Sequence, residues 1–283
     1  MKKVFISTDM EGIAESRAKA HVDKRTKIYT KFARIQSLEL AEIINAIGTG
    51  ARFVIRDAHS TAENVLPELL PDGDIKLLSA WRNTNEFGMM SGLDKSFDFA
   101  ILHGYHAAAG TKLSPLAHTF DSSAFSEIRL NNRIAGEVTF ALYKAAYIGT
   151  PVAMITGDFG AIKEAQSISP NIITVQTKKF PNNILPAKKV RELIARAAPR
   201  AARMPADKLK IELPKSFVLH ISYIKPYDAL SQSQRVPGVR LISKNTIEYK
   251  TDDFGTLLKT LRRLKITSTN SLLDKIKSLL VNN

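Results

Sequence analysis

The sequence predicts a three-layer α/β protein with a mainly parallel central sheet, followed by a smaller C-terminal α+β domain. Short apolar runs, such as Val4–Ile6 and Phe53–Ile55, alternate along the chain with longer segments of helical period. These runs show no polar alternation, as expected for parallel strands that are buried on both faces. Beyond about Met204 this alternation gives way to strand-like segments and a helical tail. We therefore predict a catalytic α/β domain over residues 1–204 and an α+β domain over residues 205–283.

The expected elements of the first domain follow from the same patterns. A helix is predicted over Tyr29–Ala46, because its apolar residues recur at helical spacing and two glycines follow it. The polar stretch Ile13–Lys27 has no clear period and predicts a long loop at the edge of the sheet. The other predicted elements are strands over residues 51–55, 75–78, 97–102, 151–155 and 172–175, a hairpin over 125–134, and helices over 64–70, 137–147, 159–168 and 186–202.

The C-terminal domain is predicted to mix short strands with helices. Strand-like segments cover residues 208–213, 217–223 and 239–249, and a short helix is expected over 228–232. A helical tail begins at about Asp252, with an interruption near residues 267–271. This order is typical of an α+β domain.

Composition limits the function. The chain has 283 residues and no cysteine, which excludes a disulfide and a thiolate metal site. No apolar run reaches the length that a membrane span needs, and the N-terminus enters a strand directly, so we expect a cytoplasmic protein without a membrane partner. The net charge of +14 is spread over a loop pair, Lys178–Lys179, and several helix faces. No aromatic residues interleave with these charges, which disfavours nucleic acid as a partner.

Carboxylates and imidazoles gather where the predicted strands end. Asp9 and Glu11 follow the first strand, and residues two apart in extended chain point the same way. Ligands of open α/β sheets bind beyond the carboxyl ends of the strands. Such a set suits zinc or a similar first-row ion, or two ions if one carboxylate bridges them. The further members of the set are Asp57, His59, His103, His106, His118, Glu137 and Asp158.

Several of these residues also have structural interpretations. Asp9 and Glu11 fit a solvated loop, and His103 fits a hydrogen-bonded core histidine, the interpretation we favour. Glu137 fits an acidic residue in the first turn of a helix, and Asp158 fits a helix N-cap. The remaining histidines, His21 and His220, lie outside the set and are interpreted as structural or surface residues.

Six short blocks occur in chain order and together resemble the zinc-dependent D-aminopeptidases of bacterial dipeptide-transport operons. They are Asp-Met-Glu-Gly-Ile at 9–13, Asp-Ala-His-Ser at 57–60, Gly-Tyr-His-Ala at 104–107, Ala-His-Thr at 117–119, Gly-Glu at 136–137 and Gly-Asp at 157–158. The resemblance extends over nearly the whole chain.

The resemblance implies a site with two Zn²⁺ ions per chain, although another first-row divalent metal would also fit. It implies that Asp9 bridges both ions, that Glu11 and His59 complete one, and that His106 and Glu137 complete the other. It further implies that His118 acts at the reacting carbon or as a base beside it. Asp57 and Asp158 are then expected to orient a histidine or to hold the substrate amine.

The implied activity is removal of the N-terminal residue, a D-amino acid such as D-Ala, from short peptides or amides by a metal-bridged hydroxide. The resemblance also implies a homo-oligomer, a decamer that encloses its active sites. Two departures concern the substrate: Phe159 stands where the family usually has a second aspartate, and the loop 14–27 is unusually basic. The alternatives are a metal-dependent amidohydrolase acting on a non-peptide substrate and a basic, non-catalytic nucleic-acid-binding protein.

Overall fold

The computed structural model describes residues 1–81, 87–112 and 114–265, which form two compact units. The first unit comprises residues 1–107, 111–117 and 136–213, and the second comprises residues 108–110, 118–135 and the chain from Pro214. The predicted domain limits, residues 1–204 and 205–283, stay a prediction. Among the described residues, no helix is both long and apolar enough to cross a membrane.

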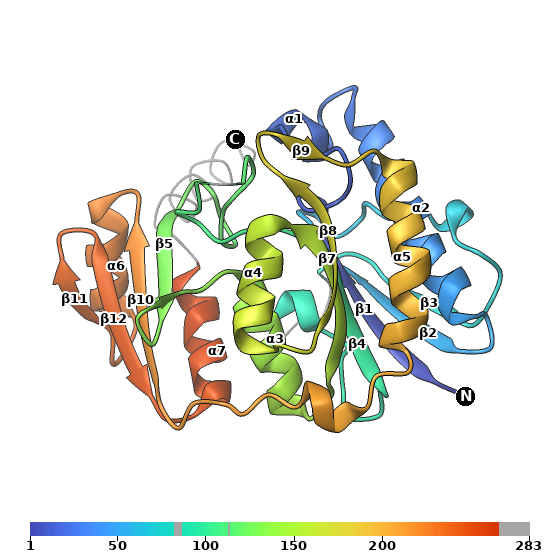
Figure 1. Cartoon of the computed structure of the whole chain (residues 1–283). Coiled ribbons are helices and arrows are strands. Elements are labelled where there is room, and N and C mark those ends of the chain that lie inside the picture. Colours follow the sequence, from blue (N-terminus) through green and yellow to red (C-terminus); the bar gives the residue numbers. More distant parts are fainter. Residues whose placement is uncertain (82–86, 113, 266–283) are drawn as a thin grey trace, which may run out of the picture. The chain divides into compact units, whose positions relative to one another are not determined.

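The first unit is built on a seven-stranded sheet with the order β3-β2-β1-β4-β7-β8-β9 (Figure 1). Neighbouring strands are parallel except for β8 and β9, which confirms the predicted mainly parallel sheet. The strands are β1 Lys3–Thr8, β2 Arg52–Asp57, β3 Ile75–Leu78, β4 Phe99–Tyr105, β7 Val152–Asp158, β8 Ile173–Lys179 and β9 Asn183–Ile184.

Helices cover both faces of this sheet. On one face α2 (Tyr29–Ile47) packs against α5 (Ala187–Ala201), and on the other α3 (Glu137–Ile148) packs against α4 (Phe159–Ile168), as Figure 1 shows. All seven residues of β4 and of β7 are buried, because each strand is covered on both faces. Each fully buried large apolar side chain contributes about 1.5–3 kcal/mol to the stability of the sheet. The short helix α1 (Lys19–Val22) is the regular element within the predicted loop 13–27.

The second unit is an antiparallel sheet with the order β11-β12-β10-β5-β6 and two helices. Of its two helices, α6 contributes the buried Ala229, and α7 contributes a buried, leucine-rich face. The hairpin predicted over residues 125–134 is confirmed as β5 and β6, and it pairs with β10 of this sheet. The bounds are β5 Phe125–Leu130, β6 Arg133–Ile134, β10 Phe217–Tyr223, β11 Arg240–Ser243, β12 Thr246–Thr251, α6 Pro226–Arg235 and α7 Phe254–Leu264.

Three local predictions were wrong. The strand predicted over residues 208–213 is a 3₁₀ turn, Ala206–Leu209, followed by irregular chain, because Leu209 alone anchors this segment in the core of the first unit. Lys178 and Lys179 were predicted in a loop, but they lie in β8, which extends beyond the predicted 172–175. The 3₁₀ turn Pro67–Leu69 replaces the helical piece predicted over 64–70. The predicted interruption near residues 267–271 lies outside the described residues.

Candidate metal centre

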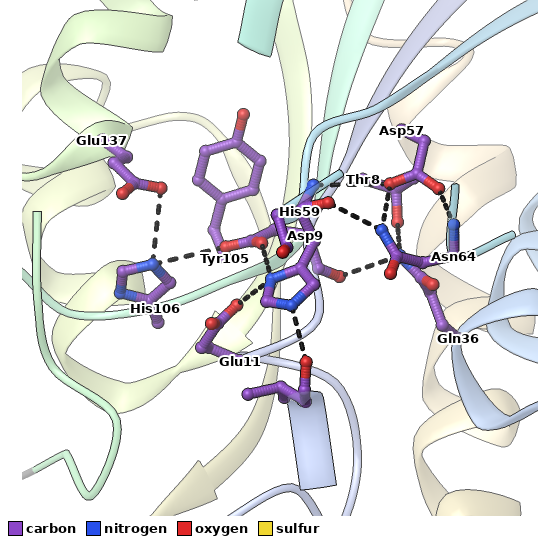
Figure 2. A network of polar contacts seen from close by, with 12 residues as sticks. Thr8, Asp9, Glu11, Gln36, Asp57, His59, Asn64, Tyr105, His106 and Glu137 are labelled. Atoms are coloured by element: carbon purple, nitrogen blue, oxygen red, sulfur yellow. Dashed lines mark hydrogen bonds and ion pairs between the residues drawn. The ribbon is translucent and has the colours of Figure 1, made fainter. Parts of the chain in front are cut away.

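The parallel pairing of β1, β2 and β4 brings three predicted site segments together. Thr8 lies in register with Asp57 on one side and with His103 on the other. Asp9 and Glu11 follow β1, His59 follows β2, and His106 follows β4. Glu137, the first residue of α3, meets His106 at the same place (Figure 2). All five side chains are buried.

The carboxylate of Asp9 lies between two imidazoles, one at each oxygen (Figure 2). Its Oδ1 is 3.3 Å from Nδ1 of His59, and its Oδ2 is 3.3 Å from Nε2 of His106. A second carboxylate meets each histidine nitrogen: Glu11 lies 2.9 Å from His59, and Glu137 lies 3.4 Å from His106. The five side chains therefore form two three-residue groups that share Asp9.

Backbone carbonyls fix the tautomers of both histidines. Nε2 of His59 lies 2.8 Å from the carbonyl oxygen of Val22, and Nδ1 of His106 lies 3.0 Å from that of Ala107. Because a carbonyl only accepts, each of these nitrogens must donate its proton. In the neutral imidazole, the other nitrogen then presents a lone pair to the carboxylates. Lone pairs that face each other in a buried site require a proton or a metal cation between them.

The pKa values of Asp9 and of the two histidines are shifted because acceptor atoms outnumber protons in this buried cluster. Burial, together with the neighbouring Glu11, raises the pKa of Asp9 to about 7. Burial lowers the pKa of His59 and of His106, but the adjacent carboxylates outweigh it and hold both pKa values well above the ordinary range. In the absence of a metal, protons thus take the place of a cation in this cluster.

The donor set and its spacing fit divalent metal ions. Ligand atoms bound at about 2.0–2.2 Å to a tetrahedral ion lie about 3.3–3.6 Å apart, close to the separations within each group. Oδ2 of Asp9 accepts no hydrogen bond from the part of the chain that the structure describes, although the residue is only 2% exposed. Two imidazoles and three carboxylates, without cysteine, suit zinc and similar first-row ions.

A model of the D-aminopeptidase family, peptidase family M55, matches residues 1–263. The chain belongs to this family. A D-aminopeptidase of Bacillus subtilis (strain 168) is 30% identical over 263 residues, which cover 89% of this chain and 92% of that protein. The solved Zn-dependent D-aminopeptidase DppA from Bacillus subtilis, described as a self-compartmentalizing protease, matches with a TM-score of 0.82 and 26% identity, covering 93% of this chain and 96% of that chain.

These comparisons confirm the predicted family, the α/β fold class and the enzyme class, a metallopeptidase. A non-catalytic nucleic-acid-binding protein, one of the alternatives, is therefore not supported. The roles of the individual site residues stay predictions.

Asp57 shapes the loop that carries His59 in this family member. Its Oδ1 accepts hydrogen bonds from the backbone N–H of His59 (3.3 Å) and the side chain of Asn64 (2.9 Å), and its Oδ2 accepts from the N–H groups of Asn64 and Val65. Both carboxylate oxygens are thus engaged within the loop. The geometry favours a role in orienting His59 over direct contact with a substrate amine.

Asp158 is the N-cap of α4, as the structural interpretation predicted. Its Oδ1 accepts from the N–H of Ala161 at 2.9 Å. Its Oδ2 accepts from the N–H of Ala107 at 3.1 Å and from the hydroxyl of Ser114. Because Ala107 adjoins His106, the cap also fixes the segment that carries this histidine. The next residue, Phe159, lies beneath Lys179, whose Nζ is 4.7 Å from the centre of the ring.

His103 is a core histidine, as favoured from the sequence, and it belongs to a buried network behind Asp9. Its Nε2 lies 3.0 Å from Glu39, and its Nδ1 lies 2.8 Å from the hydroxyl of Thr8. Gln36 donates to that hydroxyl at 3.0 Å and to the backbone oxygen of Asp9 at 3.3 Å. Gln36 and Glu39 were not predicted, although two polar residues on the buried face of a predicted helix are a signal for such a network.

Lys178 and Glu164 were also not predicted as parts of the site's surroundings. Lys178 is 1% exposed, and its ammonium group contacts the loop that follows β1. Burial lowers the pKa of Lys178 to about 8. Glu164 of α4 accepts hydrogen bonds from the first turn of α3, which begins with Glu137.

Three histidines remain, and each is described by its own surroundings. His118 belongs to the second unit and is partly buried. His21 stacks on Phe32 with ring centres 4.1 Å apart, and His220 lies 3.2 Å from Glu248. The structural interpretation of His21 and His220 agrees with these contacts.

Proposed function

We propose that the chain is a zinc aminopeptidase that holds two Zn²⁺ ions and removes an N-terminal D-residue, such as D-Ala, from short peptides or amides. The observation that carries this proposal is the Asp9 carboxylate between two imidazole nitrogens, with backbone carbonyls bound to the opposite ring nitrogens. Asp9, Glu11 and His59 would hold one ion, and Asp9, His106 and Glu137 the other.

The chain's own residues account for most of the proposed chemistry. A bound zinc ion supplies a Lewis acid and lowers the pKa of a bound water to about 7. The carboxylates of Asp9, Glu11 and Glu137 neutralise the metal charge, and burial keeps competing water away from them. His118 is proposed to give a proton to the leaving amine as a general acid.

The relatives support the choice of zinc and of a peptide substrate. The similar solved protein is a Zn-dependent D-aminopeptidase, and the similar curated protein is a D-aminopeptidase. Because the solved protein is self-compartmentalizing, we further propose that this chain forms a homo-oligomer. The expectations from the sequence, a decamer and a location in the cytoplasm, complete this proposal. Size-exclusion chromatography with light scattering tests the decamer directly.

Metal analysis combined with an isosteric substitution tests the site. Asp9→Asn removes the charge of the shared carboxylate and keeps its shape. We expect about two zinc ions per wild-type chain, loss of bound metal in Asp9→Asn, and a fall in kcat/KM for D-Ala-p-nitroanilide of about 100-fold or more. Asp72→Asn, an exposed aspartate of the same unit, serves as the matched control and should retain both.

The other outcomes are equally informative. Two metal ions without hydrolysis of D-aminoacyl substrates would overturn the peptidase assignment and favour a different amide substrate. A wild-type chain that binds neither zinc nor cobalt would overturn the metal centre itself.

A further inference from the structure

A buried ammonium group lies under the loop that carries Glu11. The Nζ atom of Lys178 is within hydrogen-bond distance of the backbone oxygens of Glu11 (2.7 Å), Ile13 (2.9 Å) and Ser16 (2.5 Å), and of the Ser16 hydroxyl. Its neighbour Thr177 donates to the backbone oxygen of Gly12 at 2.6 Å. The end of β8 thus binds four carbonyl oxygens of one short loop.

The charge of Lys178 is directed at the loop rather than at a carboxylate. Within the described part of the chain, no carboxylate oxygen forms an ion pair with its Nζ atom, so the ammonium is satisfied by neutral acceptors. Carbonyl oxygens that converge in a buried space repel one another unless a donor or cation lies among them. Without Lys178 this loop would therefore lose the group that holds its carbonyls together.

The backbone of Glu11 and the backbone of Asp9 form hydrogen bonds with different parts of the protein. The N–H of Asp9 donates to the backbone oxygen of His103 at 2.8 Å, and its own carbonyl accepts from Gln36 at 3.3 Å. The backbone oxygen of Glu11, in contrast, contacts Lys178 and the hydroxyl of Ser16. A change at Lys178 should therefore move Glu11 more than Asp9.

We propose that Lys178 is a positioning residue, which clamps the Glu11–Ser16 loop and thereby holds Glu11 against His59 at the metal centre. This inference rests on the proposed two-metal site for its effect on function. It predicts unequal consequences for the two groups: the pair Glu11 and His59 depends on the clamp, whereas His106 and Glu137 come from β4 and α3.

The test compares Lys178→Met with Lys179→Met, an exposed lysine of the same strand. Methionine keeps the length of the side chain and removes the ammonium group. Cobalt is titrated into the metal-free full-length chain and followed by calorimetry. For Lys178→Met we expect one ion to bind as in the wild type and the other about 10–100-fold more weakly. Lys179→Met should bind both ions with wild-type affinity.

A second measurement does not depend on metal. In the metal-free proteins, the N–H groups of Gly12 and Ala14 donate to Gly104 and Glu39. Hydrogen exchange of the peptide that contains residues 11–16 should be faster in Lys178→Met, with unchanged exchange in β7. Equal exchange in both variants would overturn the clamp, even if the wild type bound no cobalt and the two-metal proposal failed on its own.

Chemical rescue separates positioning from general stability. The natural chain lacks cysteine, so Lys178→Cys introduces a single thiol. Alkylation in denaturant with 2-bromoethylamine gives a side chain of nearly the same length as lysine that ends in an ammonium group. Alkylation with iodoacetamide gives a side chain that ends in a neutral amide. Each product is then refolded beside an equally treated wild type. We expect only the aminoethylated chain to recover the second cobalt site. Equal behaviour of the two products, or equal weakening of both ions in step with the melting temperature, would overturn the proposal.

Discussion

His118 differs from the other predicted site residues because it belongs to the second compact unit. Its proposed role, proton transfer to the leaving amine, requires no metal coordination. We therefore expect His118→Ala to keep its full zinc content and to lose about 10²–10⁴-fold in kcat, the range for removal of a general acid. His220→Ala, another histidine of the same unit, should leave kcat unchanged. Loss of a zinc ion from His118→Ala would instead identify His118 as a ligand.

At the residue scale, the sequence predicted which side chains form the candidate site but not which residues hold them in position. Asp9, His59 and His106 were predicted to converge because each follows a strand of one parallel sheet, and the structure brings them together. Lys178 was missed because its partners lie more than 160 residues earlier in the chain. Such a contact depends on the order of strands in the sheet, which local patterns do not reveal.

At the scale of elements, α4 determines where α3 begins. Oε1 of Glu164 accepts from the N–H groups of Gly136 (2.7 Å) and Thr139 (3.0 Å), donors that a helix start leaves without intrahelical partners. Burial raises the pKa of Glu164 above its ordinary value. Between the unfolded and folded pKa values the folded protein binds more protons than the unfolded one, so this carboxyl's contribution to stability falls as pH rises.

Glu164→Gln removes the titration and keeps an acceptor oxygen. The free energy of unfolding of the wild type minus that of Glu164→Gln should therefore decrease from about pH 4.5 to pH 7 in urea unfolding. Glu192→Gln on the surface of α5 provides the control, and its difference from the wild type should change less over this range. A wild-type advantage that grows with pH would show that the helix N-terminus outweighs burial.

Sequence patterns predicted an element correctly where it has a regular buried face and a clear end signal, but they did not predict which segments pair with one another. The helix predicted over residues 159–168 has the observed bounds, since Asp158 supplies a readable N-cap. The segment 208–213 alternates like a strand, yet it has no neighbouring edge to pair with in the described structure. The hairpin 125–134 was recognised, but its pairing with β10, some 90 residues later, was not.

At the scale of the whole molecule, metal removal should weaken the folded state. Metal removal would leave three buried carboxylates without the divalent charge that balances them, and ligands that bind only the folded chain stabilise it by mass action, by about 2.7 kcal/mol at 100 times Kd. We expect chelation to lower the melting temperature of the wild type and added zinc to restore it. Asp9→Asn should show neither shift. A wild-type melting temperature that changes with neither chelator nor zinc would contradict a contribution of the metal to stability.

The fold class was predictable because buried parallel strands and amphipathic helices alternate strongly in the sequence. The mixing of distant segments within the second unit was not, since residues 118–135 join a sheet whose other strands begin at Phe217. Connections of this kind follow from tertiary pairing and leave no period in the chain.

Main chain packs directly on main chain beside the candidate metal-binding residues. A Cβ atom on Gly12 would lie 1.8 Å from the carbonyl oxygen of Tyr105, and one on Gly104, which has φ of +70°, would lie 2.3 Å from that of Asp9. The N–H of Gly12 also donates to the oxygen of Gly104 at 2.7 Å. The segments that carry Asp9 and His106 therefore rest on atoms that every amino acid shares. Any other amino acid at Gly12 or Gly104 would force the chain after β1 away from β4, so these two positions set how closely the two segments approach.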